Sequence, residues 1–176
     1  MNKFPPRYWK RLLALIFVSL QSDFLIGLSS DKDQPIELSS NTAVRDEKGG
    51  FTIYSGNVLL KQGSLHIKAE KLKVFHVSGT AKKIIASGSP VNLIQQPSLG
   101  KDMVNATAFE MTYERDTNLI ILKKNAEIKQ TNSKVKGDKI TYSISKQMVI
   151  AESNQNTTEN RVNVVLPRDL INGNQE

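Results

Sequence analysis

The side chains that could carry chemistry in this sequence are few and poorly spaced for catalysis. The chain has no Cys and only two His residues, His66 and His76. The lack of Cys excludes a disulfide scaffold, a thiol nucleophile and a Cys-based zinc site. The H-x-H, H-E-x-x-H and G-x-S-x-G patterns of metal sites and hydrolases do not occur. Since His66 alternates with Leu65 and Ile67, we expect it to point outward from a strand.

Acidic side chains recur at equivalent places instead of forming one isolated pair. Glu70, Glu110 and Asp138 each stand in a segment that is repeated along the chain. A catalytic carboxylate pair normally occurs once, so this repetition predicts a structural role. We therefore predict no enzyme activity, no cofactor and no metal. A polysaccharide-modifying or oligosaccharide-binding jelly-roll enzyme would need an unrepeated carboxylate pair in a cleft.

The first thirty residues have the composition of an export signal. Four basic residues lie among the first eleven, and an apolar run over residues 12–20 follows at once. This run is shorter than the roughly 20 apolar residues that a membrane-spanning helix needs. We predict a cleaved signal peptide over residues 1–30, with an uncleaved anchor across residues 12–28 as the alternative.

The net charge must be corrected for this leader before it suggests a partner. The whole chain carries 24 Lys and Arg against 17 Asp and Glu, a formal charge of +7. Without residues 1–30 the balance is 20 against 16, or +4. Lysines alternate along several predicted strands, but aromatic residues that could stack on bases are few. We therefore predict no nucleic-acid partner; a phosphorylated lipid or a membrane surface matches an exported basic protein better.

From residue 36 onward the apolar residues repeat with a period of two. Leu65 and Ile67, for example, alternate with polar neighbours, which is typical of a strand with one buried face. Turns rich in Gly, Asn and Ser interrupt the runs every 13 to 20 residues. Strands joined by such tight turns pair antiparallel. The sequence predicts one all-β domain over residues 31–170, with a polar C-terminal tail at 171–176.

The predicted strands also form three repeated hairpin units. Their first segments lie at residues 55–58, 87–91 and 123–126, and their second segments at 69–74, 108–113 and 137–142. The two segments are 13, 20 and 13 residues apart. The middle unit therefore has seven extra residues, which we assign to a longer loop at 97–102. Such repeats predict stacked units, none of which can bury its apolar face alone.

A stack of hairpins that does not close leaves two edge strands with unpaired backbone groups. The candidates are residues 35–43 and 161–166, which Pro35 and Pro167 limit. Either these edges recruit another chain, or they simply end the sheet. The inward face is rich in Val, Ile, Leu and Ala, so it is either an ordinary core or an apolar groove.

Five short motifs together resemble the OstA-like family of periplasmic lipopolysaccharide-transport proteins. They are Asp33-Gln34-Pro35-Ile36, Ser55-Gly56-Asn57-Val58 with Gln62-Gly63, Ile67-Lys68-Ala69-Glu70-Lys71-Leu72, Lys136 to Tyr142, and Arg161-Val162 to Val165-Leu166-Pro167. They occur in the family's order with compatible spacing and extend over most of residues 31–170. Three positions depart from the family pattern. The loop at 77–83 is short, Ser89-Pro90 stands where Lys-Pro is common, and Lys123-Lys124 replaces a Thr-Gly, which removes a glycine from a predicted bulge.

The resemblance implies a fold, a ligand and partners. The fold would be an open antiparallel β-jellyroll, a V-shaped double sheet built from repeated hairpins. Its interior would bind the acyl chains of lipid A, and the protein would carry lipopolysaccharide across the periplasm. The N-terminal edge would meet an inner-membrane transport partner of the same fold, and the C-terminal edge would meet the outer-membrane translocon. Copies would also stack head to tail as a homo-oligomer.

The resemblance also turns the inward apolar residues into candidates for lipid contact. They are Ile36, Leu38, Tyr54, Val58, Leu60, Leu65, Ile67, Leu72, Val91, Leu93, Met111, Tyr113, Ala126, Ile128, Ile140 and Tyr142. Residues near the open rim would touch lipid, and the others would hold the two sheets together. Lysines near the rim would either meet lipid phosphates and sugars or form a solvated face. The alternative function is that of a structural β protein of the cell envelope, with a closed, dry core and no ligand.

Overall fold

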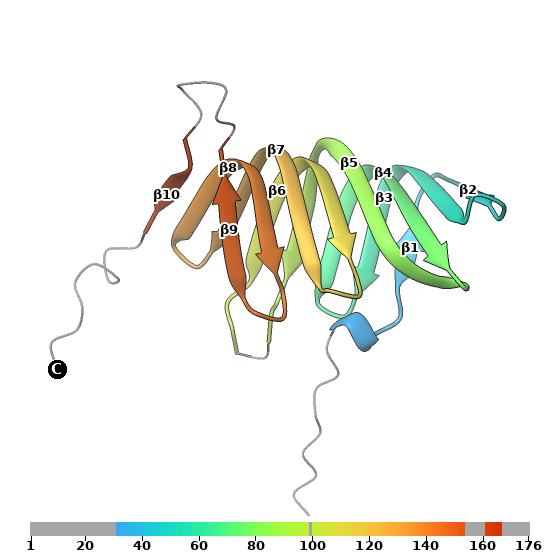
Figure 1. Cartoon of the computed structure of the whole chain (residues 1–176), viewed down its shortest axis with the longest axis horizontal. Helices are drawn as coiled ribbons and strands as arrows, with labels where there is room; N and C mark the ends of the chain where they lie inside the picture. Colours follow the sequence, from blue (N-terminus) through green and yellow to red (C-terminus); the bar gives the residue numbers. More distant parts are fainter. Residues whose placement is uncertain (1–30, 99, 154–160, 167–176) are drawn as a thin grey trace, which may run out of the picture.

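The fold consists almost entirely of antiparallel strands (Figure 1). The structure is a computed structural model that describes residues 31–98, 100–153 and 161–166. Its elements are the 3-10 helix η1 (Asp31–Asp33) and the strands β1 (Glu37–Ser39), β2 (Thr42–Asp46), β3 (Phe51–Gln62), β4 (Leu65–Val77), β5 (Thr80–Gln95), β6 (Val104–Glu114), β7 (Leu119–Gln130), β8 (Ser133–Ser143), β9 (Met148–Glu152) and β10 (Asn163–Val165). The predicted signal peptide and polar tail lie outside the described residues.

The strands form one sheet whose order follows the chain. The order is β1-β3-β4-β5-β6-β7-β8-β10, with β2 also paired to β3 and β9 also paired to β8. All pairs are antiparallel, because tight turns join the central strands. The longer connection lies between β5 and β6, over residues 96–103, as the spacing of the middle repeat predicts.

A line of β-bulges crosses the middle of the sheet. Five successive strand pairs change register, between Ser55 and Val58, Lys68 and Lys71, Ser87 and Val91, Thr107 and Glu110, and Lys123 and Ala126. A bulge bends its strand and increases the local twist. Because the bulges are aligned from strand to strand, the sheet folds over itself along this line, and its two halves face each other (Figure 1). The predicted open antiparallel β-jellyroll is confirmed.

The bulge in β7 forms although Lys124 stands where the family pattern predicts a glycine. Lys124 and Asn125 both have left-handed backbone conformations, with φ of 64° and 59°. For Lys this conformation costs roughly 1 kcal/mol relative to the right-handed region. The Lys124 ammonium forms a salt bridge with Glu110 on the neighbouring strand β6, which offsets part of this cost. A lysine at this position therefore strains the bulge but does not prevent it from forming.

Two strands share each open edge of the sheet. β1 and β2 lie end to end on β3, which matches the predicted edge at 35–43 and extends it to Asp46. On the other side, β10, which lies within the predicted edge strand 161–166, pairs with residues 134–136 of β8, and β9 pairs with residues 139–143. The predicted edge at 161–166 does not include β9. Its placement depends on the register of β8 and cannot be derived from alternation.

Candidate functional site

The interior between the two half-sheets holds the predicted inward residues. Thirteen of the sixteen are buried, with exposed fractions of 4% or less, and Ile36, Leu38 and Tyr54 are partly buried against them. The buried thirteen are Val58, Leu60, Leu65, Ile67, Leu72, Val91, Leu93, Met111, Tyr113, Ala126, Ile128, Ile140 and Tyr142. These side chains come from six strands, β3 to β8, so the fold gathers them into one apolar surface.

Eight further buried residues line the same interior and are not among the predicted inward residues. They are Val74, Ile84, Ala86, Val104, Ala106, Ala108, Ile120 and Leu122. Each lies on the inward face of β4, β5, β6 or β7, so extending the two-residue alternation along the whole strand would have found most of them. The bulges hide the rest, because an extra residue shifts the phase of the alternation in mid-strand.

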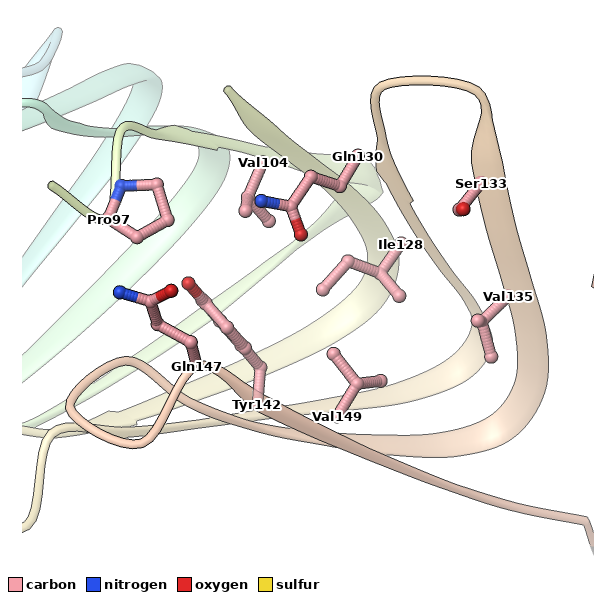
Figure 2. Close-up of a pocket in the computed structure, with 9 residues that line it drawn as sticks. All are labelled: Pro97, Val104, Ile128, Gln130, Ser133, Val135, Tyr142, Gln147 and Val149. Atoms are coloured by element: carbon pink, nitrogen blue, oxygen red, sulfur yellow. The ribbon is translucent and has the colours of Figure 1, made fainter. Parts of the chain in front are cut away.

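The interior opens to the outside at its C-terminal end as a small apolar pocket (Figure 2). The lining residues are Pro97, Val104, Ile128, Gln130, Ser133, Val135, Tyr142, Gln147 and Val149. They come from both halves: Val104 and Ile128 belong to one half-sheet, and Tyr142 and Val149 to the other. The pocket volume is about 100 Å³. An apolar cavity of about 150 Å³ can hold benzene, so a pocket of this size is too small for a long alkyl chain.

Buried polar side chains lie at the strand ends farthest from the line of bulges, which form the open side of the jellyroll. The side chains of Gln62 and Gln95 are 0% and 1% exposed, although they lie beside apolar neighbours. The Tyr142 hydroxyl donates a hydrogen bond of 3.4 Å to Gln95 Oε1, across the interior from β8 to β5. Burial, with a smaller contribution from the negative charge of Asp31, raises the pKa of Tyr142 to about 12. Tyr142 therefore stays neutral and acts as a donor near neutral pH.

Tyr113 shares this polar region from the neighbouring strand β6. Its hydroxyl donates to Asn118 Oδ1 at 3.2 Å. Burial raises the pKa of Tyr113; the Arg115 charge opposes this rise and the Asp31 charge adds to it. Two charged residues at the rim, one from the N-terminal segment and one from the β6–β7 turn, thus act on the same buried hydroxyl.

The outer face of β7 and β8 carries a carboxylate surrounded by lysines. The Glu127 carboxylate lies 2.9 Å from Lys129 Nζ and 3.0 Å from both Lys134 Nζ and Lys136 Nζ. Burial alone would raise the pKa of Glu127, but hydrogen bonds from the three ammonium groups outweigh it and lower the pKa to about 2. Lys134 and Lys136 also pair through their backbones with β10, so this cluster lies beside the C-terminal edge.

The C-terminal edge exposes many more apolar side chains than the N-terminal edge. On β9, β10 and the residues next to β10, the exposed apolar residues are Met148, Val149, Ile150, Val162, Val164, Val165 and Leu166. On the N-terminal edge, Val44 is exposed to 63%. Both outer edges also present backbone groups of strands that pair on one side only.

Two further titratable side chains form hydrogen bonds within the sheet. Glu70 accepts a hydrogen bond of 3.1 Å from the backbone N–H of Ser89 beside the bulge in β5, and the His76 ring lies 3.1 Å from the Thr52 hydroxyl. Over the described ranges, His, Asp and Glu do not gather into a group of three or more that could hold a metal ion. Within the same ranges, no helix is long and apolar enough to cross a membrane.

A sheet folded along a line of bulges, with an apolar interior and two unpaired edges, defines the class of open β-jellyroll proteins. The chain belongs to the family described as LptA/(LptD N-terminal domain) LPS transport protein, which it matches over residues 37–148.

Relatives of known name are similar over most of their length. The lipopolysaccharide export system protein LptA of Haemophilus influenzae is 33% identical over 159 residues, which cover 89% of this chain and 90% of the relative. LptA of Escherichia coli K12 is 34% identical, covering 85% of this chain and 80% of the relative. The crystal structure of LptH from Pseudomonas aeruginosa, described as the LptA-homologous periplasmic component of the lipopolysaccharide transport device, matches with a TM-score of 0.73. That match has 25% identity and covers 79% of this chain and 99% of LptH.

Proposed function

We propose that this protein carries lipopolysaccharide through the periplasm, with the lipid A acyl chains held between its two half-sheets. The observation that carries the proposal is the interior itself, which gathers the apolar side chains of six strands and opens at one end. Membership of the family and the names of its relatives support lipopolysaccharide as the ligand. The leader predicted at residues 1–30 supports export to the periplasm.

The size of the hydrophobic effect explains why such a carrier is needed. Burial of each methylene is favourable by about 0.8 kcal/mol, so exposing an acyl chain of about twelve carbons to water costs roughly 9 kcal/mol of free energy. A lipid with several chains therefore does not cross an aqueous compartment unshielded. An apolar groove keeps the chains covered at every step and needs no catalytic residue, so the energy for directional transport must come from other components.

The line of bulges supplies a hinge for opening the interior. Register shifts break the hydrogen-bond ladder at the same level in five strand pairs, and residues there adopt left-handed conformations, such as Gly56 at φ 77° and Asn57 at φ 48°. Bending at this line changes the angle between the half-sheets while each half keeps its own pairing. Opening at the rim would widen the pocket at Val104 and Ile128 into a groove.

The two edges support strand addition as the way in which the protein is linked to its partners. A strand added to β1 and β2, or to β9 and β10, would satisfy the unpaired backbone groups and extend the sheet. Because the two edges differ, contact between them is head to tail and extends as a filament. We propose that the N-terminal edge binds the inner-membrane partner and the C-terminal edge binds the outer-membrane translocon.

One observation favours a second candidate, a ligand-free structural protein of the envelope. In the described conformation the interior is filled by its own side chains, and the pocket holds only about 100 Å³. A structural protein would keep this closed core at all times, whereas a carrier must open it. An experiment that tests whether lipid reaches the interior distinguishes the two candidates.

Photo-crosslinking in cells provides that experiment. A photoreactive residue at Val104 or Ile128 lines the pocket, and the same residue at the adjacent outward positions Asn105 or Lys129 is the matched control. We expect lipopolysaccharide adducts at the two pocket positions and none at the two controls. Equal labelling inside and outside, or no adduct at either pocket position, would contradict lipid carriage and favour the structural candidate.

Head-to-tail stacking needs a separate measurement. Removing residues 161–176 deletes β10 and half of the C-terminal edge while leaving β1 to β9 intact. We expect the average mass of the full chain to rise with concentration and that of the shortened chain to stay constant. If both chains associate to the same extent, the C-terminal edge does not mediate stacking.

A further inference from the structure

The segment of residues 31–34, which we call the strap, lies across the open side of the jellyroll (Figure 1). The Lys32 carbonyl oxygen accepts two hydrogen bonds of 3.0 Å, from Gln62 Nε2 and from Arg115 Nη2. Gln62 ends β3, whereas Arg115 follows β6, and β4 and β5 separate these strands in the sheet. The Lys32 carbonyl reaches both side chains only because the sheet is folded over. The strap therefore joins the two half-sheets at their open ends, which we call the lips of the groove.

Asp31 fixes the strap to the first lip, which consists of the β3–β4 turn and the end of β5. Its carboxylate accepts hydrogen bonds from the Ser64 backbone N–H at 2.7 Å, the Ser64 hydroxyl at 2.6 Å and Gln95 Nε2 at 3.1 Å. The turn leaves room for this carboxylate because residue 63 is glycine: a Cβ there would lie 2.3 Å from Asp31 Oδ1. The first lip thus presents three hydrogen-bond donors that surround one carboxylate.

The second lip holds the strap through Arg115. Arg115 Nη1 donates to the Ala81 carbonyl at 2.8 Å, which fixes the guanidinium on β5, while Nη2 reaches the strap. Among the described residues, the buried side-chain atoms without a hydrogen-bond partner are Gln62 Oε1 and Arg115 Nε. Both belong to side chains that hold Lys32, so the closed seam leaves polar groups unsatisfied at the same place.

We propose that the strap is a displaceable latch over the lipid groove and that the Asp31 carboxylate occupies the binding site of a lipid phosphate. The inference rests on the proposed function. When the strap is displaced, the negative charge of Asp31 is removed from the lips. The groups that held the strap are then free to bind another anion: the Ser64 N–H and hydroxyl, Gln95 Nε2 and the Arg115 guanidinium. A phosphate oxygen accepts hydrogen bonds from the same kinds of donor as a carboxylate. The phosphates of lipid A adjoin its acyl chains, so they would lie at the lips while the chains lie inside.

The first test follows the latch itself. The Asp31→Ala variant removes the three hydrogen bonds that the Asp31 carboxylate accepts from the first lip, so we expect amide exchange at Ser64 and Gln96 to rise about tenfold or more. The Gln96 N–H donates to the Ser64 hydroxyl and reports on the same lip. The Asp46→Ala variant is the matched control, because Asp46 also accepts a backbone N–H at 2.7 Å, in the β2–β3 turn. Unchanged exchange in Asp31→Ala would overturn the latch.

The second test follows phosphate recognition in the full chain. Binding is measured with bisphosphorylated lipid A, with the same lipid after removal of both phosphates, and with inorganic phosphate alone. We expect the wild type to prefer the phosphorylated lipid about tenfold, and Arg115→Ala to lose this preference. We expect Asp31→Ala to bind the phosphorylated lipid more tightly, because the competing carboxylate is gone. A preference that survives in Arg115→Ala would overturn the phosphate site.

A label on the strap connects the two tests. The chain has no Cys, so Lys32→Cys gives a single labelling position on an exposed side chain. We expect phosphorylated lipid A to mobilise the label and inorganic phosphate at the same concentration to leave it fixed. Mobilisation by inorganic phosphate would show that the site binds the free anion and would overturn the lipid site. If both lipids bind equally and the label stays fixed, the latch inference fails while lipid carriage stands. If neither lipid binds, the proposed function itself fails.

Discussion

Glu127 offers a quantitative test of the electrostatics beside the C-terminal edge. Its side chain is 17% exposed, and its carboxylate lies within 3.0 Å of three lysine ammonium groups. The pKa of Glu127 is lowered from 4.5 to about 2. At about 1.4 kcal/mol per pKa unit, a shift of this size corresponds to at most about 3 kcal/mol of stability. Solvent screening at a surface site reduces this contribution to about 1 kcal/mol.

The sign of the pH dependence follows from the direction of the shift. Because the folded-state pKa of Glu127 lies below the unfolded value, its contribution is complete above about pH 4.5 and is lost as the pH falls toward 2. The Glu127→Gln variant removes this contribution and leaves Lys129, Lys134 and Lys136 facing one another. We expect the variant to be about 1 kcal/mol less stable than the wild type at pH 7, and this difference to shrink steadily below pH 4.5.

Urea denaturation at pH 7, 5, 4 and 3 measures this difference directly. Other carboxylates titrate in both proteins, so they cancel when the two free energies of unfolding are subtracted. Glu47→Gln is the matched control, because Glu47 is 81% exposed and pairs only at 3.5 Å with Arg45, so we expect no measurable effect. A Glu127→Gln variant as stable as the wild type at pH 7, or a difference that does not change between pH 7 and pH 3, would refute the reasoning.

Three further predictions concern the bulge, the interior and the buried hydroxyl. Lys124→Gly should raise the free energy of unfolding by up to about 1 kcal/mol, because the relieved backbone strain exceeds the lost exposed salt bridge to Glu110; a lower stability in urea would contradict this. Leu93→Ala should cost about 2–5 kcal/mol, and Ile94→Ala, on the outward face of the same strand, clearly less; equal costs would show that the strand faces are misassigned. Between pH 10 and 12 the wild type should lose stability, because the unfolded chain releases the Tyr142 proton while the folded chain keeps it. Tyr142→Phe should show a smaller loss in the same titration, and an identical loss would contradict the raised pKa of Tyr142.

The sequence predicts the fold of this protein well because the information is local. Alternation with a period of two sets which side chains of a strand share a face, and tight turns set which strands pair. Leu65, Ile67 and Leu93 could therefore be assigned to the interior without coordinates. The family resemblance then predicted that these hairpins form an open jellyroll.

Features that depend on residues distant in the chain required the tertiary structure. Alternation predicts neither that Arg115 meets the Lys32 carbonyl nor that Asp31 lies in the Ser64 turn, since both contacts exist only after the sheet folds along its bulges. The same holds for β9, whose place at the edge depends on the register of β8. The sequence by itself determined the faces of the strands, because side-chain direction follows from backbone geometry. Only the tertiary structure decided which faces and lips meet, because that depends on how far each bulge bends the sheet.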